Sequence, residues 1–314
     1  MAKDILVSLH GRRIGLDVDG NLIIDGVQCC PAPNPTGAED YFVDGNVGTS
    51  GAGKSWEGAF DTVAEAIAAS NISIALTANR WWARRNRIFI QGDGEFNEDL
   101  TVMPEKTDMI GQGYDILPFP RIVGNHAVAA ATVGTRLINL GFYTDATGDL
   151  MSWPAGSHGL QILGCWMHPG TTSTKAIEIT DSAHVRIVGN EITVGTGSMS
   201  IIFAEGISIE GTVCHDTFID DNNITATKGV SVVEAAAAAM GSRMKGNLIR
   251  ATGYCIDDNS DDFQVVRNDM ISDAAATAAG VGVIDCNSAL AVANRITCND
   301  HANAPFPVEG TLAG

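Results

Sequence analysis

Two groups of residues have types and spacings that chemistry could use. Gly48 to Ser55 fits the pattern G-x-x-x-x-G-K-S, in which backbone amides hold phosphate, the lysine reaches the terminal phosphates and the serine binds Mg²⁺. The second group consists of acidic residues that recur after short apolar segments, where stacked carboxylates could bind Ca²⁺ or act as acid and base. Its members are Asp181, Glu210, Glu234, Asp258 and Asp285, with Asp220, Asp221, Asp257, Asp261 and Asp262 beside them.

The segment 48–55 follows a short strand-like segment and precedes a helical one, as a phosphate-binding loop does. That loop also needs a parallel sheet with helical crossovers, and the chain beyond it lacks this pattern. The only apolar run that could supply the second acidic strand is VGVID, residues 281–285, which belongs to a repeat described below. We therefore expect a Gly- and Ser-rich turn here and no nucleotide cofactor.

The acidic residues have two interpretations. Cleavage of a polysaccharide needs two carboxylates placed across a sugar bond, or a base beside a cation-bound uronate. Acidic side chains also favour turns for local hydrogen bonding. Aromatic residues, which line many sugar grooves, make up only 6% of the chain. The sequence thus favours no catalytic residue, and a polysaccharide lyase or glycoside hydrolase stays as the alternative. The weak candidates for that alternative are Asp258, Asp261 and Asp221.

The seven histidines show no H-x-H or H-E-x-x-H spacing, and the seven cysteines show no C-x-x-C pair. No metal is therefore expected. Five of the cysteines lie in or beside apolar segments, which predicts buried, reduced thiols and fits synthesis in a cytoplasm.

A sequence repeat indicates the fold that positions these residues. One six-residue pattern returns with spacings of 25, 25, 32, 25, 21 and 26 residues. It consists of an apolar residue, any residue, a small or polar residue, the recurring position, any residue and a second apolar residue. Its alternation has a period of two, which indicates strands. The recurring positions are Leu140, Cys165, Asn190, Asn222, Asn247, Asn268 and Asn294. The chain is therefore predicted to be all-β, a parallel β-helix with about 25 residues per coil.

The asparagines have a physical role in that fold. Coils stack about 4.8 Å apart, so equivalent residues lie above one another. A stacked asparagine can bond its side-chain amide to the next coil and tolerate a left-handed turn. We expect a structural ladder formed by Asn190, Asn222, Asn247, Asn268 and Asn294.

The stretch YFVDGNVGTSGAGKSWEGAFDTVAEAIAAS (41–70) resembles the entry to pectate-lyase-like right-handed β-helices, and RIFIQGDGEFNEDLTVMPEKTDMIGQG (87–113) resembles their first coils. The resemblance covers roughly residues 41–300. It implies the fold strongly and activity weakly, because that fold hosts lyases, hydrolases and inert structural proteins. It also implies a helix near 55–70 that caps the core, which Ser55 could start and Phe60, Val63, Ala64 and Ile67 could anchor.

Residues 1–37 differ from the rest. They predict short strands with an Asp-Gly turn, followed by the stiff segment PAPNPTG. An apolar arm without a core of its own is expected to dock on a partner, or else to form a hairpin that covers the end of the β-helix. Its apolar residues include Ile5, Leu6, Val7, Leu9, Ile14, Leu16, Leu22, Ile23 and Ile24.

Such arms resemble the attachment segments of virion proteins of tailed bacteriophages. The resemblance implies a virion-surface protein, either a capsid decoration protein or a tail spike or fibre, with capsid or tail proteins as partners. It also implies a homotrimer, and for a spike a host surface glycan as ligand. The predicted organisation is an arm and linker at 1–37, a β-helix at 38–300 and a tail at 301–314.

The composition argues against other partners. The net charge of −18 disfavours nucleic acid and anionic membranes, because phosphate binding needs clustered Lys and Arg. The main basic cluster consists of Arg80, Arg84, Arg85 and Arg87 around Trp81 and Trp82, and it is expected to be a turn or an edge helix. The sequence has no run of about 18 apolar residues, so no membrane span is expected.

Overall fold

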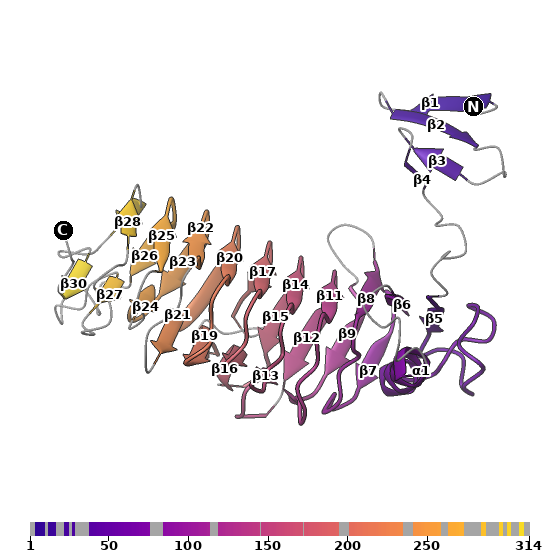
Figure 1. Cartoon of the computed structure of the whole chain (residues 1–314), viewed down its shortest axis with the longest axis horizontal. Coiled ribbons are helices and arrows are strands. Elements are labelled where there is room, and N and C mark those ends of the chain that lie inside the picture. Colours follow the sequence, from indigo (N-terminus) through magenta and orange to yellow (C-terminus); the bar gives the residue numbers. More distant parts are fainter. Residues whose placement is uncertain are drawn as a thin grey trace.

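A computed structural model shows a right-handed parallel β-helix that runs from β5 to the last strand of the chain (Figure 1). Side chains are described for residues 38–75, 84–113, 119–144, 146–171, 173–194, 201–233, 241–257 and 263–271. Beyond these ranges the structure describes only the backbones of the strands named below.

The β-helix has three faces, and from residue 107 onward each coil contributes to each face in turn. The first face is a 10-stranded parallel sheet. Its strands are β5 (Asp40–Val43), β6 (Asn86–Gln91), β8 (Thr107–Gln112), β11 (Arg136–Ile138), β14 (Gln161–Leu163), β17 (Arg186–Val188), β20 (Phe218–Asp220), β22 (Arg243–Lys245), β25 (Gln264–Val266) and β28 (Arg295–Thr297).

The second and third faces together form a 16-stranded sheet, because the long strand β21 (Asn223–Glu234) takes part in both. The other strands of the second face are β7 (Glu95–Asn97), β9 (Arg121–Val123), β12 (Gly141–Thr144), β15 (Trp166–Pro169), β18 (Glu191–Ile192), β23 (Leu248–Ala251), β26 (Asp269–Ser272) and β29 (Asp300–Ala302). Those of the third face are β10 (His126–Ala127), β13 (Met151–Trp153), β16 (Ser173–Thr180), β19 (Phe203–Gly211), β24 (Ile256–Asp258), β27 (Ile284–Cys286) and β30 (Val308–Gly310).

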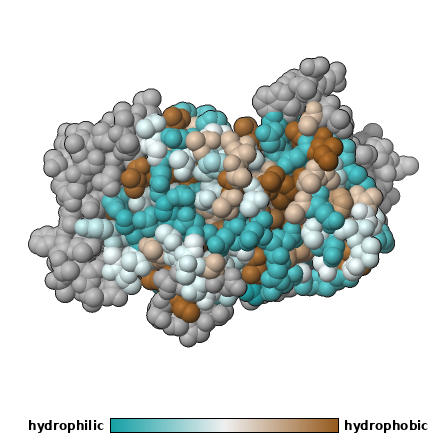
Figure 2. Space-filling view, turned by 90° about the horizontal axis from the view of Figure 1, so that it is seen from below, coloured by the Kyte–Doolittle hydropathy of each residue, from teal (hydrophilic) through white to brown (hydrophobic). Residues whose placement is uncertain are grey.

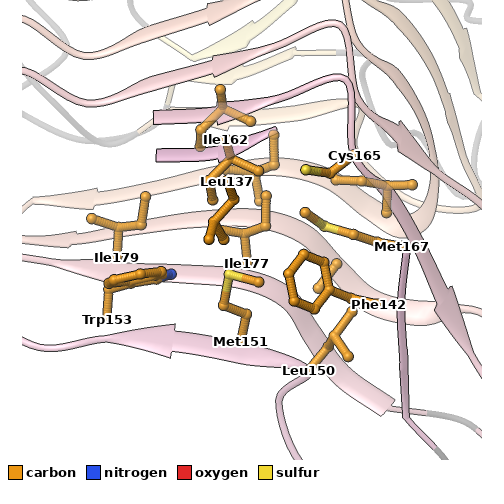
Figure 3. Close-up of a cluster of buried hydrophobic side chains, with 14 of the residues drawn as sticks. Leu137, Phe142, Leu150, Met151, Trp153, Ile162, Cys165, Met167, Ile177 and Ile179 are labelled. Carbon is orange, nitrogen blue, oxygen red and sulfur yellow. The ribbon is translucent and has the colours of Figure 1, made fainter. Parts of the chain in front are cut away.

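The core follows from the alternation of apolar residues along these strands. Leu137, Ile162 and Ile187 come from successive strands of the first face, pair in register and are completely buried. They meet side chains of the other two faces, such as Phe142 and Ile177 (Figure 3). The same alternation directs the residues between them outward, so each face carries its own row of surface residues.

The capping helix α1 spans Val63–Ala75, so it begins later than the predicted 55–70. Thr62 and Glu65 form a capping box, in which each backbone N–H donates to the other side chain at 3.3 Å. Ser55, the predicted N-cap, instead accepts a bond from the Gly58 N–H within the preceding loop. The prediction placed the start at Ser55 because it took the first serine before the apolar stripe.

The helix lies against the first face and closes that end of the core (Figure 1). Val63 and Ile67 are buried in it as predicted, and Phe60 packs against it from the loop. Ala64 is exposed, contrary to the prediction, because the later start rotates the buried side toward Ala66 and Ser70.

Four of the five predicted asparagines meet at the turn from the first face to the second. Each of Asn190, Asn222 and Asn247 donates both its backbone N–H and its side-chain N–H to the Oδ1 of the next asparagine, at 2.8–3.0 Å. Asn268 is the last member of this series among the described residues, and Cys165 donates its backbone N–H to Asn190 at the other end. All four amides also donate to a carbonyl of the preceding coil. Asn294 lies outside the described residues.

The left-handed turn falls on the residue before each ladder position, not on the asparagine as expected. This residue has φ between 53° and 70° in every described coil from Asn139 onward. The asparagine keeps ordinary dihedrals because its buried amide must point along the stack. The left-handed residues are Asn139, Gly164, Gly189, Asp221, Gly246 and Arg267.

The predicted boundary at residue 300 is not a boundary of the fold. β29 pairs with β26, and β30 pairs with β27, so the second and third faces continue into the predicted tail. These strands are only three residues long and carry no asparagine motif, which is why the repeat pattern stopped short of them.

The arm forms a sheet of its own. β1 (Asp4–Leu9), β2 (Arg12–Leu16), β3 (Leu22–Ile24) and β4 (Val27–Gln28) pair antiparallel in sequence order. Among the strand pairings that the structure describes, none joins this sheet to the β-helix.

The thiols of Cys165, Cys214 and Cys255 are free and buried, as predicted for these three. Burial raises the pKa of Cys165 and of Cys255 to about 12, so both stay protonated and act as small apolar residues.

The ladder predicts a large loss of stability from a single substitution. Asn222→Ala should lower the free energy of unfolding by at least roughly 2 kcal/mol, because it leaves buried groups of Asn190 and Ile187 without partners. The neighbouring Asn223→Ala is the matched control, because Asn223 is exposed and should change stability by less than about 0.5 kcal/mol. Urea denaturation followed by circular dichroism measures both. Equal effects of the two substitutions would contradict the structural role of the ladder.

Candidate functional site

The loop 48–55 does not have the geometry of a phosphate-binding loop. The N–H groups of Gly51 and Gly53 donate to the carbonyls of Ala59 and Gly58, at 2.8 and 2.7 Å. Lys54 lies 3.9 Å from the centroid of the Tyr41 ring and forms an ion pair with Glu39. Its hydrogen bond is the main reason that the pKa of Glu39 falls to about 2. The amides and the lysine that would hold phosphate are therefore engaged inside the loop.

The N-terminus of α1 already holds an anion. The N–H groups of Val63 and Ala64 donate to the two carboxylate oxygens of Glu98, at 2.8 and 2.9 Å. A carboxylate at this position is stabilised by the helix dipole, as a phosphate would be. Glu98 thus ties the capping helix to the first coils and occupies the position that a phosphate would need.

The acidic residues after the apolar segments do not form one column. Strand pairing places Thr180 level with Glu210, and Gly211 level with Glu234. Glu210 is therefore one residue out of register with Glu234 across the sheet. Asp258 is level with Val232. These acids are out of register because the strands of the third face end at different positions, which spacing alone does not reveal.

Two of the three weak catalytic candidates, Asp221 and Asp258, belong to different parts of the coil. Asp221 is the exposed left-handed residue of an asparagine turn, with φ of 57°. Asp258 belongs to β24 on the third face, at a backbone register otherwise held by buried apolar residues such as Ile209 and Val232. Asp261 lies outside the described residues. The position of Asp221 is explained by turn geometry, since Asp tolerates this backbone conformation.

The outer side of the third face carries lysines that bridge carboxylates of different strands. Lys175 of β16 forms ion pairs with Glu178 and with Glu210 of the next strand, β19. Burial lowers the pKa of Lys175, but the two carboxylate hydrogen bonds outweigh burial and raise it overall. In the same way Lys228 pairs with Glu205 at 3.3 Å and with Asp257 at 2.7 Å. These carboxylates serve as links between coils.

The second face gathers aromatic and cationic residues that are scattered in the sequence. Phe142 and Met167 point into the core, so Tyr143, Trp166 and His168 take outward positions on β12 and β15. The His168 ring stacks on Tyr143 at 5.3 Å and lies 5.0 Å from Trp166, while the Arg121 guanidinium lies 4.1 Å from the Tyr143 centroid. We call these four residues, Arg121, Tyr143, Trp166 and His168, the aromatic face.

Two polar atoms of the aromatic face lack partners. His168 Nδ1 and Arg121 Nε are buried without a hydrogen bond within the protein. Burial, followed by the charge of Arg121, lowers the pKa of His168, so its ring is neutral at pH 7. Tyr143, Trp166 and the Arg121 guanidinium are partly exposed beside the buried His168, and they offer hydrogen-bond donors and a flat apolar surface together, a combination that suits a sugar ring.

The basic cluster is neutralised by acids within the described part of the chain. Arg84 pairs with Glu39 at 2.8 Å, Arg85 with Asp108 at 2.9 Å, and the guanidinium of Arg87 forms two 2.7 Å bonds to Asp40. Arg80, Trp81 and Trp82 lie outside the described residues. These ion pairs give the cluster a structural role at the edge of the first face.

Sequence spacing missed one cluster. His184, His215 and Asp216 meet at the turn from the third face to the first, with their ligand atoms within 4.8 Å of one another. A signal for it was present, because His184 lies six residues before Asn190 and Asp216 lies six residues before Asn222. Aligning the coils on their ladder positions would have placed His184 level with Asp216 and next to His215, whereas a search for metal motifs within one strand could not.

Comparison with known protein families, with curated proteins and with solved structures finds no match to this chain. No helix in the part of the chain that the structure describes has the length and apolar character needed to cross a membrane.

The loop geometry predicts that the full chain gives no saturable heat when MgATP is titrated into it. Lys54→Ala should leave this result unchanged, and should cost about 0–1 kcal/mol of stability through loss of the exposed ion pair with Glu39. Calorimetry with and without Mg²⁺ measures the binding. Micromolar, Mg²⁺-dependent binding that Lys54→Ala abolishes would show that the loop opens to take phosphate.

Proposed function

We propose that this protein is a non-enzymatic structural protein of a tailed-bacteriophage virion, a capsid decoration protein whose arm docks on the particle and whose β-helix lies exposed at the surface. The observation that carries the proposal is the separate antiparallel sheet of the arm, with its rows of apolar residues. The resemblance of the arm to phage attachment segments supplies the type of particle.

The strand register makes the arm amphipathic. Residues paired directly across an antiparallel sheet lie on the same face. The register aligns Val7 with Ile14, Ile14 with Ile24, and Ile24 with Val27, a row that crosses all four strands. The same face carries a second row, in which Leu16 is paired with Leu22. Ser8 and Arg13 form a polar pair in an alternate register.

A four-stranded sheet of this size cannot bury such a face by itself. Fully burying one Val, Leu or Ile side chain is worth about 1.5–3 kcal/mol, so six on one face favour a partner surface strongly. The nine-residue segment between β4 and residue 38 includes PAPNPTG, which suits a semi-rigid spacer between anchor and body.

The body has the features of a rigid projecting element. Its buried amide ladder and its lysine–carboxylate bridges join the successive coils between Cys165 and Asn268. The described acidic residues of the third face that could bind a substrate take part in these bridges or cap turns, as Asp181 does for the N–H groups of Thr212 and Val213. We further propose a homotrimer, because phage surface proteins sit at symmetric sites.

A second candidate, a tail spike or fibre that binds a host surface glycan, is favoured by one observation. The aromatic face presents Tyr143 and Trp166 beside two buried polar atoms without partners. Seen from below, the described surface is a mosaic in which hydrophilic residues alternate with separate hydrophobic patches, as a surface for a polar ligand would be (Figure 2).

The decoration proposal predicts that deleting residues 1–37 leaves a folded β-helix that no longer co-sediments with phage capsids. Within the full chain, Ile24→Asp should abolish co-sedimentation because it charges the apolar row. Ile23→Asp is the matched control, since Ile23 pairs with Gly15 and Gln28 on the opposite face and should retain most binding.

Three results would redirect the proposal. Undiminished capsid binding by the truncated chain would reject the arm as anchor. Binding to isolated tails and not to capsids would favour the spike. A monomer in solution and on the particle, measured by native mass spectrometry, would reject the trimer.

The glycan alternative predicts that Trp166→Ala weakens binding to a bacterial surface polysaccharide by at least about tenfold, as truncation of a central tryptophan does at other interfaces. Trp56→Ala is the control, because Trp56 is also half-buried but packs against Phe42 in the entry loop. Binding to lipopolysaccharide, alginate and polygalacturonate is measured on an array, together with release of reducing or unsaturated ends. Equal loss in both variants would remove the aromatic face from consideration, and released ends would replace binding by cleavage.

A further inference from the structure

We infer that His184, His215 and Asp216 form a binding site for one divalent transition-metal ion, of the zinc, cobalt or nickel type, which clips two successive coils together. The site lies at the turn from the third face to the first. It is separate from the arm, the aromatic face and the loop 48–55.

The repeat places these residues on a column of left-handed turn residues. In this column the backbone N–H of one member donates to the carbonyl of the residue that directly precedes the next member in the sequence. Gly134 donates to His158, Gly159 to Ala183 and His184 to His215, at 2.8–3.1 Å. His184 and Asp216 are therefore on adjacent coils. The members are Lys106, Gly134, Gly159, His184, Asp216 and Gly241, with φ between 43° and 76°.

Glycine is the usual residue for a left-handed backbone conformation. Gly159 occupies the column position before His184, and Gly241 occupies the position after Asp216. His184 and Asp216 adopt left-handed conformations with φ of 59° and 55°, at a backbone cost that glycine would avoid. Gly241 also leaves room for the carboxylate, because a Cβ there would lie 2.6 Å from Asp216 Oδ1. The column thus brings the two side chains side by side with open space at the next coil.

The distances fit a shared ion. Nδ1 of His184 and Nδ1 of His215 lie 3.2 and 3.4 Å from the same oxygen, Oδ2 of Asp216. A zinc ion with bonds of about 2.0–2.1 Å in a tetrahedral arrangement separates its ligand atoms by about 3.3 Å. Both observed separations equal that edge and exceed the usual hydrogen-bond length of about 2.9 Å.

The donor set selects the kind of ion. Two imidazole nitrogens and one carboxylate oxygen suit Zn²⁺, Co²⁺ or Ni²⁺, whereas Ca²⁺ and Mg²⁺ prefer sites made of oxygen alone. The side chains are 63%, 37% and 45% exposed, so an ion can enter from solvent and water can complete its coordination.

Metal binding at this site would act on the coil with the longest step between ladder asparagines in the described part of the chain. His184 lies six residues before Asn190 and His215 lies seven residues before Asn222. The two turns are therefore one coil apart, across the 32-residue step between these asparagines, which is longer than the steps of 25 on either side. An ion held by both turns would fix the two ends of this coil, and would stabilise the folded state according to its concentration over its dissociation constant.

The experiment uses the untagged full chain, stripped with chelator, and titrates it with ZnCl₂ and CoCl₂ by calorimetry. We expect one equivalent to bind, visible Co²⁺ absorption typical of nitrogen and carboxylate ligands, and a rise in Tm with added Zn²⁺. His215→Ala and Asp216→Asn should each weaken the affinity by at least about tenfold, since even the loss of a group that only orients a ligand costs that much. His184→Asn should do the same while keeping a side chain that tolerates the left-handed backbone.

Asp221→Asn is the matched control, because Asp221 is an exposed aspartate with nearly the same φ on a neighbouring turn. It should leave the affinity unchanged. Affinity that is equal in all variants, or a loss in Asp221→Asn as large as in Asp216→Asn, would overturn the assignment. Displacement of Zn²⁺ by a modest excess of Ca²⁺ would also overturn it, since that marks an oxygen site.

Discussion

The structure depends on one constraint, which is that successive coils must stack in phase at the spacing of hydrogen-bonded strands. Every turn then has to repeat its backbone conformation at the same place in each coil. The described coils meet this requirement with two columns of left-handed residues, one before each ladder position and one six residues before it. Glycine fills half of these positions, and Asn, Asp, His, Lys and Arg fill the others.

In-phase stacking also determines how polar groups are satisfied. A buried asparagine is acceptable only when the next coil offers a matching group, and each amide of the ladder finds one in its neighbour. On the outer side of the third face, Lys175 and Lys228 form ion pairs with carboxylates of adjacent strands and so satisfy those charges in the same way. Side chains that a search for enzymes would select, such as Glu210 and Asp257, are used by these lysine bridges.

The same stacking creates the two surfaces that remain for ligands. Outward positions of β12 and β15 come together because the strands pair in register, and they form the aromatic face from residues far apart in the chain. The turn on another edge brings His184 to Asp216 across a full coil. Tyr143 and Trp166 on the first surface, and His184, His215 and Asp216 on the second, are at least partly exposed, whereas His168 is buried beside the two rings.

The sequence by itself determined the fold, because the spacing of the asparagine motif and the period-two alternation are local signals that each coil repeats. It also indicated the ladder positions, the separate arm and the buried thiols of Cys165, Cys214 and Cys255. The start of α1 was misplaced, since the capping box of Thr62 and Glu65 and the anchor Glu98 decide it, and Glu98 comes from a later coil. The continuation into β29 and β30 was missed because strands of three residues carry no periodic signal.

Only the tertiary structure decided which side chains meet. Whether the acids form a column depends on where each strand of the third face ends, and pairing places Asp258 level with Val232 and apart from Glu210. Whether 48–55 is open to phosphate depends on partners from the loop itself, from Glu39 and from Glu98. These outcomes rest on contacts between residues tens of positions apart, and their distances are set by the stacking of coils, which local residue preferences do not encode.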